Sequence, residues 1–122
     1  MYRLKLHNVC FNVEVTSSGA DTLKEAEVKI LSNEVCESMH NTTGFLHNDQ
    51  MCAGYPEGKK GPFSGDSGGP LQCLSPSGRW QLTGVAIWGN TNVVKPAIYT
   101  RISAVLDWIM SYVEGIHLFI IC

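Results

Sequence analysis

The alternation of apolar and polar residues predicts several short strands along the chain. Residues 27–31 (EVKIL) alternate in this way, which is typical of a half-buried strand. Residues 79–89 (RWQLTGVAIWG) form a longer β-rich run after a hairpin-like turn at 75–78 (SPSG). Further short strands are predicted at 51–55, 70–74 and 97–102. Short strands joined by turns indicate a small antiparallel barrel or sandwich.

Two helices are predicted beside these strands. Ser32 has the character of an N-cap for a short helix through Met39. Ser103 is expected to cap a final helix. That helix carries its apolar residues on one face, namely Val105, Trp108, Ile109 and Tyr112.

Length and charge narrow the class of protein. The chain has 122 residues, enough for about one domain, and its 44% hydrophobic content is typical of a globular fold. The net charge is −2 and the basic residues are scattered, so we expect no nucleic-acid partner. No run reaches the roughly 18 apolar residues of a membrane span, so none is predicted. The first residues, MYRLKL, are too short to be a signal peptide.

The five cysteines favour disulfides over a metal site. They are widely spaced and form no C-x-x-C pair, so we expect neither a bound metal nor a cofactor. An odd number leaves at least one thiol unpaired. Asn41-Thr42-Thr43 is a glycosylation acceptor triplet, which has meaning only in a secreted chain. The cysteines and the triplet both indicate an extracellular protein, whereas the missing signal peptide indicates the opposite.

Gly65-Asp66-Ser67-Gly68-Gly69 contains a candidate nucleophile, Ser67. The stretch satisfies the G-x-S-x-G pattern of an α/β-hydrolase, but that pattern needs a helix after the serine. Here Pro70 and a strand-like LQCL follow instead, which disfavours that fold. A tight glycine-rich turn without chemistry is the other interpretation, and the pentapeptide alone leaves it open.

The wider order of motifs resembles the C-terminal half of a chymotrypsin-like or trypsin-like serine protease (peptidase family S1), with the N-terminal barrel missing. The resemblance is carried by MCAGY, GDSGGPLQC, GVAIWG, KPAIYTRI and DWI, in that order. It implies an all-β fold: the C-terminal six-stranded antiparallel barrel of the chymotrypsin-like double barrel, with a C-terminal helix. The expected domains are a non-family segment at 1–14, a partial protease domain at 15–113 and an apolar tail at 114–122.

The resemblance implies roles for the residues around Ser67. Ser67 corresponds to the nucleophile that forms an acyl-enzyme during peptide-bond hydrolysis. The backbone N–H groups of Gly65 and Ser67 correspond to the oxyanion hole, which stabilises charge that develops in the transition state. Asp66 corresponds to the buried aspartate that pairs with the N-terminus freed by zymogen cleavage.

It also implies a substrate site and two disulfides. Ile87-Trp88-Gly89 corresponds to the edge strand that binds a substrate backbone by β-augmentation. The specificity pocket would have Gly61 in place of an aspartate and Ala97 in one wall, which favours a small or medium apolar side chain. Phe63 replaces a pocket cysteine. The implied disulfides join Cys36 to Cys52 and Cys73 to an upstream partner, for which Cys10 is the only candidate.

The chain departs from the family in the groups that would activate Ser67. Its histidines have no family context as a base, and we interpret His40 and His47 as solvated loop residues. The aspartates have no catalytic context either, and the activation motif is absent. The histidines and aspartates without a catalytic context are His7, His40, His47, His117, Asp21, Asp49 and Asp107.

The sequence therefore predicts a secreted serine-endopeptidase family domain that is inactive as this isolated chain. Completed by a first barrel, it would take a protein or peptide substrate. The alternatives are a catalytically dead pseudoprotease that binds a protein partner through its exposed interbarrel face, and a truncated product without function.

Overall fold

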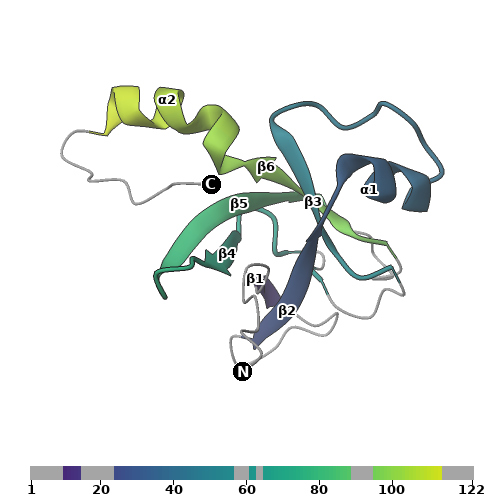
Figure 1. Cartoon of the computed structure of the whole chain (residues 1–122), viewed down its shortest axis with the longest axis horizontal. Coiled ribbons are helices and arrows are strands. Elements are labelled where there is room, and N and C mark those ends of the chain that lie inside the picture. Colours follow the sequence, from purple (N-terminus) through teal and green to yellow (C-terminus); the bar gives the residue numbers. More distant parts are fainter. Residues whose placement is uncertain (1–9, 15–23, 57–60, 63–64, 89–94, 114–122) are drawn as a thin grey trace.

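The computed structural model describes residues 10–14, 24–56, 61–62, 65–88 and 95–113 (Figure 1). Within these ranges the chain forms six strands and two helices. The strands are β1 (Cys10–Glu14), β2 (Lys24–Leu31), β3 (Gln50–Gly54), β4 (Pro70–Leu74), β5 (Trp80–Trp88) and β6 (Ala97–Arg101). The helices are α1 (Asn33–Met39) and α2 (Ile102–Tyr112). No helix in the described ranges has the length and apolar content needed to cross a membrane.

The strands close into an antiparallel barrel in the order β1-β2-β3-β6-β5-β4, with β1 pairing β4 at the seam. Helix α1 packs against β3 and α2 against β5, and the two helices lie at opposite sides of the view in Figure 1. The expected all-β fold, one chymotrypsin-type barrel followed by a C-terminal helix, is confirmed.

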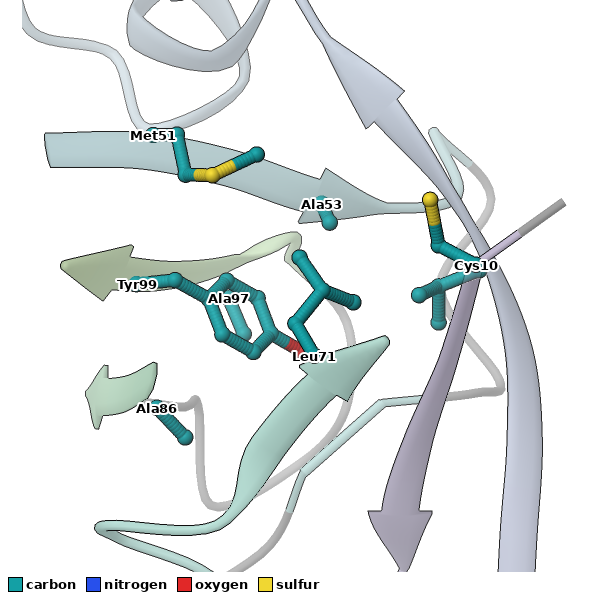
Figure 2. Close-up of a cluster of buried hydrophobic side chains, with 8 residues drawn as sticks. Cys10, Met51, Ala53, Leu71, Ala86, Ala97 and Tyr99 are labelled. Atoms are coloured by element: carbon teal, nitrogen blue, oxygen red, sulfur yellow. The ribbon is translucent and has the colours of Figure 1, made fainter. Parts of the chain in front are cut away.

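Alternation along the strands fills the barrel interior. In β2, Ala26 and Val28 are buried while Glu25 and Glu27 are exposed, so one face points inward. Every strand contributes to the buried cluster, and Figure 2 shows the side chains converging. The cluster consists of Cys10, Val28, Met51, Ala53, Leu71, Ala86, Ala97 and Tyr99. Burial of these side chains is the main term that favours the closed barrel.

The strand β1 is the element that the sequence analysis did not predict. It lies within the segment 1–14 that we expected outside the family domain, yet all five of its residues pair with β2. The alternation in FNVEV is the signal that favours a strand here. The other predicted strands are present, with ends that differ by a few residues, and β4 has the predicted bounds.

One helix cap was predicted correctly and the other was not. The Ser32 side chain caps α1 by accepting a hydrogen bond from the Val35 N–H at 3.3 Å. Ser103 does not cap α2, which begins at Ile102 with Arg101 in the N-cap position. Arg101 bonds to the segment before β3 through its N–H to the Asp49 carbonyl (2.7 Å), so β6 leads directly into the helix.

The predicted apolar face of α2 also needs correction. Ile102 is buried and Val105 and Ile109 are half-buried, so these residues face the barrel. Trp108 and Tyr112 are exposed, and their rings contact each other at 5.4 Å between centroids. The inward stripe therefore follows the spacing i, i+3, i+7 from Ile102, and the two aromatic residues lie beside it.

Both expected disulfides are present. Cys10 in β1 and Cys73 in β4 are direct partners in the strand register, so their bond crosses the seam of the barrel. Cys36 in α1 is bonded to Cys52 in β3 and fixes that helix to the sheet. With sequence separations of 63 and 16, loop-closure entropy gives the two bonds about 4 and about 3 kcal/mol.

Tyr99 is among the largest fully buried side chains, and it interacts electrostatically with Asp66. Burial raises the pKa of the Tyr99 phenol well above its ordinary value of 10.0, and the Asp66 carboxylate raises it further. Both effects disfavour the charged phenolate, so Tyr99 is neutral in the folded protein over the whole physiological range.

We expect loss of the seam disulfide to be costly. The double variant Cys10→Ala, Cys73→Ala should lower the free energy of unfolding by about 4 kcal/mol in urea titrations. Cys122→Ala is the matched control and should leave it unchanged, because the other four cysteines are bonded to each other. Thiol titration of the denatured, unreduced chain should find one thiol. Three thiols per chain would contradict the two bonds.

The buried phenol predicts a stability loss at high pH. Above about pH 10 the unfolded chain releases the Tyr99 proton while the folded protein keeps it, so stability declines by up to about 1.4 kcal/mol per pH unit. Below that pH both states are neutral and the effect is absent. Tyr99→Phe should remove this part of the decline when urea unfolding is measured between pH 8 and about 11. Parallel pH profiles for the two proteins would contradict the prediction.

Candidate active site

Ser67 lies in a tight turn directly before β4. The Gly69 N–H donates to the Asp66 carbonyl at 2.8 Å, and this hydrogen bond closes the turn. Ser67 is exposed within the turn. Two further bonds hold the turn against β5: the Gly68 N–H donates to the Ala86 carbonyl at 2.8 Å, and the Ala86 N–H donates to the Gly69 carbonyl at 2.9 Å. These bonds hold the backbone on both sides of Ser67, and the residue itself is exposed.

The glycines on both sides of Asp66 and Ser67 are required by the backbone conformation. Gly65 has a φ of 106° and Gly68 a φ of 84°, a region that side chains disfavour. At both positions a Cβ atom would meet nothing within 4 Å, so space is not the constraint. This geometry fits the expected role of Gly65, because an oxyanion donor needs its N–H held in an unusual direction.

Asp66 differs from its neighbours because its side chain is buried, with 4% of its surface exposed. Burial of the Tyr99 phenol raises its pKa, and the nearby Asp66 carboxylate raises it further. A substrate at the surface could not reach this carboxylate. The burial fits the structural role expected of Asp66 rather than a direct chemical one.

Ile87 and Trp88 extend from the strand that holds the Ser67 turn. Both are exposed at the end of β5, next to Ala86. The β5–β6 register shifts between Ala86 and Trp88, which is the mark of a bulge. Bulges occur next to active sites, where they redirect a side chain. The structure thus brings Ser67, Ile87 and Trp88 into one neighbourhood, while Gly89 lies outside the described residues.

The expected pocket residues are buried. The backbone φ angle of Gly61 is 156°. Ala97 is the first residue of β6 and pairs with Ala53 of β3. Ala97 is 3% exposed and belongs to the core cluster, and Gly61 is buried as well. Phe63 lies outside the described residues.

His40 is the site residue that sequence reasoning misjudged. It is half-buried, and its Nε2 lies 3.0 Å from the Pro96 carbonyl, to which it must donate. Its ring contacts Trp88 at 5.5 Å and Phe45 at 5.6 Å between centroids. The interpretation of His40 as a solvated residue is therefore wrong, whereas His47 is exposed as expected.

No signal in the sequence could have identified these contacts of His40. Pro96 lies 56 residues further along the chain and Trp88 is in a different strand, so only the folded barrel brings them together. Through them His40 links the end of α1 to the start of β6 and to the exposed end of β5.

Within the described part of the chain, no histidine hydrogen-bonds Ser67. The Nε2 atom of His40 is occupied by Pro96, and His47 is exposed in the loop before β3. Asp49 and Asp107 are exposed as well. His7, His117 and Asp21 lie outside the described residues. The described residues therefore position a serine without assembling a triad around it.

Comparison with known proteins agrees with this geometry. The family model described as Trypsin matches residues 9–109, a range that begins just before β1. Transmembrane protease serine 7 from mouse is 40% identical over 106 residues, and transmembrane protease serine 9 from rat is 43% identical over 94 residues. Transmembrane protease serine 11G from mouse is 34% identical over an alignment of 132 residues.

The matches cover most of this chain and little of the relatives. They span 84%, 75% and 91% of the chain, but only 12%, 9% and 32% of those three proteins. The chain therefore spans between about a tenth and a third of the length of these relatives. The family model alone spans most of the sequence. This chain belongs to the trypsin family of serine proteases.

Proposed function

We propose that this chain is the nucleophile-bearing half of a serine endopeptidase domain and that it does not hydrolyse peptide bonds by itself. The observation that carries the proposal is the exposed Ser67 on a turn bonded to β5, within a trypsin-family barrel. Ser67 Oγ would attack the scissile carbonyl and form the acyl-enzyme, and the N–H groups of Gly65 and Ser67 would stabilise the oxyanion.

The attack requires a base that removes the proton from Ser67 Oγ. A serine hydroxyl is a weak nucleophile at neutral pH, and in triads a histidine takes its proton and later gives it to the leaving amine. Neither described histidine is placed for this role, because Pro96 occupies His40 and His47 lies in an exposed loop. Enzymes without a triad member keep roughly 10³–10⁴-fold acceleration over water, which arises from the oxyanion hole and substrate binding.

The substrate we propose is a peptide with a small or medium apolar side chain before the scissile bond. Gly61 provides no counter-charge for Lys or Arg, and Ala97 narrows the pocket relative to glycine. The exposed end of β5 at Ile87 and Trp88 would pair with the peptide backbone.

A binding module is the second candidate function. Ile87 and Trp88 present an apolar surface beside Ser67, and such a surface is suited to a protein partner whether or not the serine reacts. This candidate predicts a serine that stays unreactive even when a first barrel is supplied.

We propose an extracellular location. The two disulfides favour an oxidising compartment, and the similar proteins are named as transmembrane proteases. Protein substrates and partners would be met there.

The isolated chain should not react with an activated-serine probe. We expect a fluorophosphonate to label the purified chain no more than it labels Ser67→Ala, because neither described histidine is placed to activate the hydroxyl. Intact mass spectrometry measures the labelled fraction. Stoichiometric labelling that disappears in Ser67→Ala would overturn the proposed inactivity.

Completing the domain should restore reactivity. We would join to this chain a first barrel of the trypsin-family type, with its N-terminus freed, and repeat the labelling. Stoichiometric labelling of Ser67 is expected if the chain is an enzyme half. An unlabelled hybrid with both disulfides formed would contradict the enzyme and favour the binding module.

The same hybrid tests the pocket. Gly61→Asp places a side chain at a φ of 156°, so the comparison uses hybrids shown to have formed both disulfides. In these, Gly61→Asp should raise kcat/KM for substrates with Lys or Arg before the scissile bond at least about tenfold relative to apolar ones, because it supplies a buried counter-charge. Ser77→Asp adds the same charge on an exposed turn and is the matched control. An equal effect of the two substitutions would show that Gly61 does not set specificity.

A further inference from the structure

The loop after α1 presents the triplet Asn41-Thr42-Thr43 to solvent. All three side chains are exposed, so an attached group would meet no barrel residue at its point of attachment. Asn41 has a φ of 55°, a left-handed conformation that places it in a sharp turn after the helix. The triplet lies between Cys36 and Cys52, so the disulfide fixes both ends of the segment that carries it.

Glu37 folds this loop against the end of α1. Its two carboxylate oxygens accept hydrogen bonds from the N–H groups of Gly44 (2.8 Å) and Leu46 (3.2 Å), and its carbonyl accepts one from Thr42 (3.0 Å). The bond from Gly44, followed by that from Leu46, lowers the pKa of Glu37, so the carboxylate stays charged at neutral pH. The triplet therefore protrudes from an ordered loop.

The residue before Asn41 is fixed against the candidate active site. His40 contacts the Trp88 ring at 5.5 Å between centroids and donates to the Pro96 carbonyl. Consecutive Cα atoms are about 3.8 Å apart, so the Cα atom of Asn41 lies about that far from the Cα atom of His40, whose ring contacts Trp88. A large group on Asn41 would occupy space at the border of the exposed end of β5.

We propose that Asn41 carries an N-linked oligosaccharide that lies beside Trp88 and restricts access to the Ile87–Trp88 end of β5. In the transfer, Nδ2 of the Asn41 amide bonds to the anomeric carbon of a lipid-pyrophosphate-linked oligosaccharide. The bond from that carbon to the pyrophosphate oxygen breaks, the lipid pyrophosphate leaves with the electron pair, and the amide loses one proton.

The two disulfides support the proposal, because they form in the same oxidising compartments in which such glycans are attached. The inference is independent of catalysis, since a glycan would border this surface whether Ser67 is reactive or not.

The first experiment tests attachment. The full chain would be secreted behind a cleavable leader and treated with an N-glycan amidase in heavy-oxygen water, and peptides would be mapped by mass spectrometry. We expect a heavy-oxygen aspartate at residue 41 in the wild type and in Thr43→Ser, which keeps the triplet. Thr43→Ala should abolish it. A secreted wild-type chain with unmodified Asn41 overturns the proposal.

The second experiment tests where the glycan lies. Trp80 and Trp88 expose 51% and 49% of their surface, and they stand at the two ends of β5, about 26 Å apart. Trp80 is thus a matched internal control. Carbene footprinting of the secreted protein should label Trp88 about twofold less before trimming to a single sugar than after it, with Trp80 unchanged. Equal labelling of Trp88 in both forms overturns the placement.

Discussion

The pairing of β1 with β4 is the interaction on which the rest of the structure depends. These strands are the first and the fourth in the sequence and close the barrel, and the Cys10–Cys73 bond crosses that seam between register partners. Without closure, β1 and β4 would each expose an edge of unpaired backbone groups and the inner faces of Leu71 and Cys10 would meet water. Because β4 begins at Pro70, just after the Ser67 turn, the seam also fixes the strand from which that turn departs.

The neighbouring strand β5 converts this closure into a site. Ala86 exchanges backbone hydrogen bonds with the turn, and Ile87 and Trp88 follow it directly, so these bonds hold the Ser67 turn next to the exposed strand end. Beneath the turn, Asp66 and Tyr99 are both buried; burial raises the pKa of the Tyr99 phenol, and the Asp66 carboxylate raises it further. Burying a carboxylate costs free energy unless surrounding groups compensate its charge. The geometry of residues 65–68 therefore depends on the barrel interior around Asp66 as well as on β5.

Local patterns predicted the features whose causes are local. Ser32 caps α1 because its side chain reaches an N–H three residues away, and β4 has the predicted bounds because a turn and a proline define its start. Features that depend on distant contacts were missed: β1 is a strand because β2 and β4 pair with it, and Arg101 at the end of β6 bonds to Asp49, with α2 beginning directly after it. The contacts of His40 with Pro96 and Trp88 belong to the same group. The disulfides lay between these cases, since family resemblance implied the pairs that spacing alone left open.

The described residues separate two properties that catalysis needs together. Positioning of Ser67 arises from hydrogen bonds between the turn and β5, from glycine conformations and from barrel closure, and all of these lie within the described residues. Activation of Ser67 needs a base beside its hydroxyl, but His40 Nε2 donates to the Pro96 carbonyl and His47 lies exposed in the loop before β3. Since the two properties have different physical origins, an ordered Ser67 turn is not evidence of a reactive one. Substitutions inside the barrel would disturb positioning alone, so only the addition of a first barrel can tell an incomplete enzyme from a protein that uses the same surface for binding.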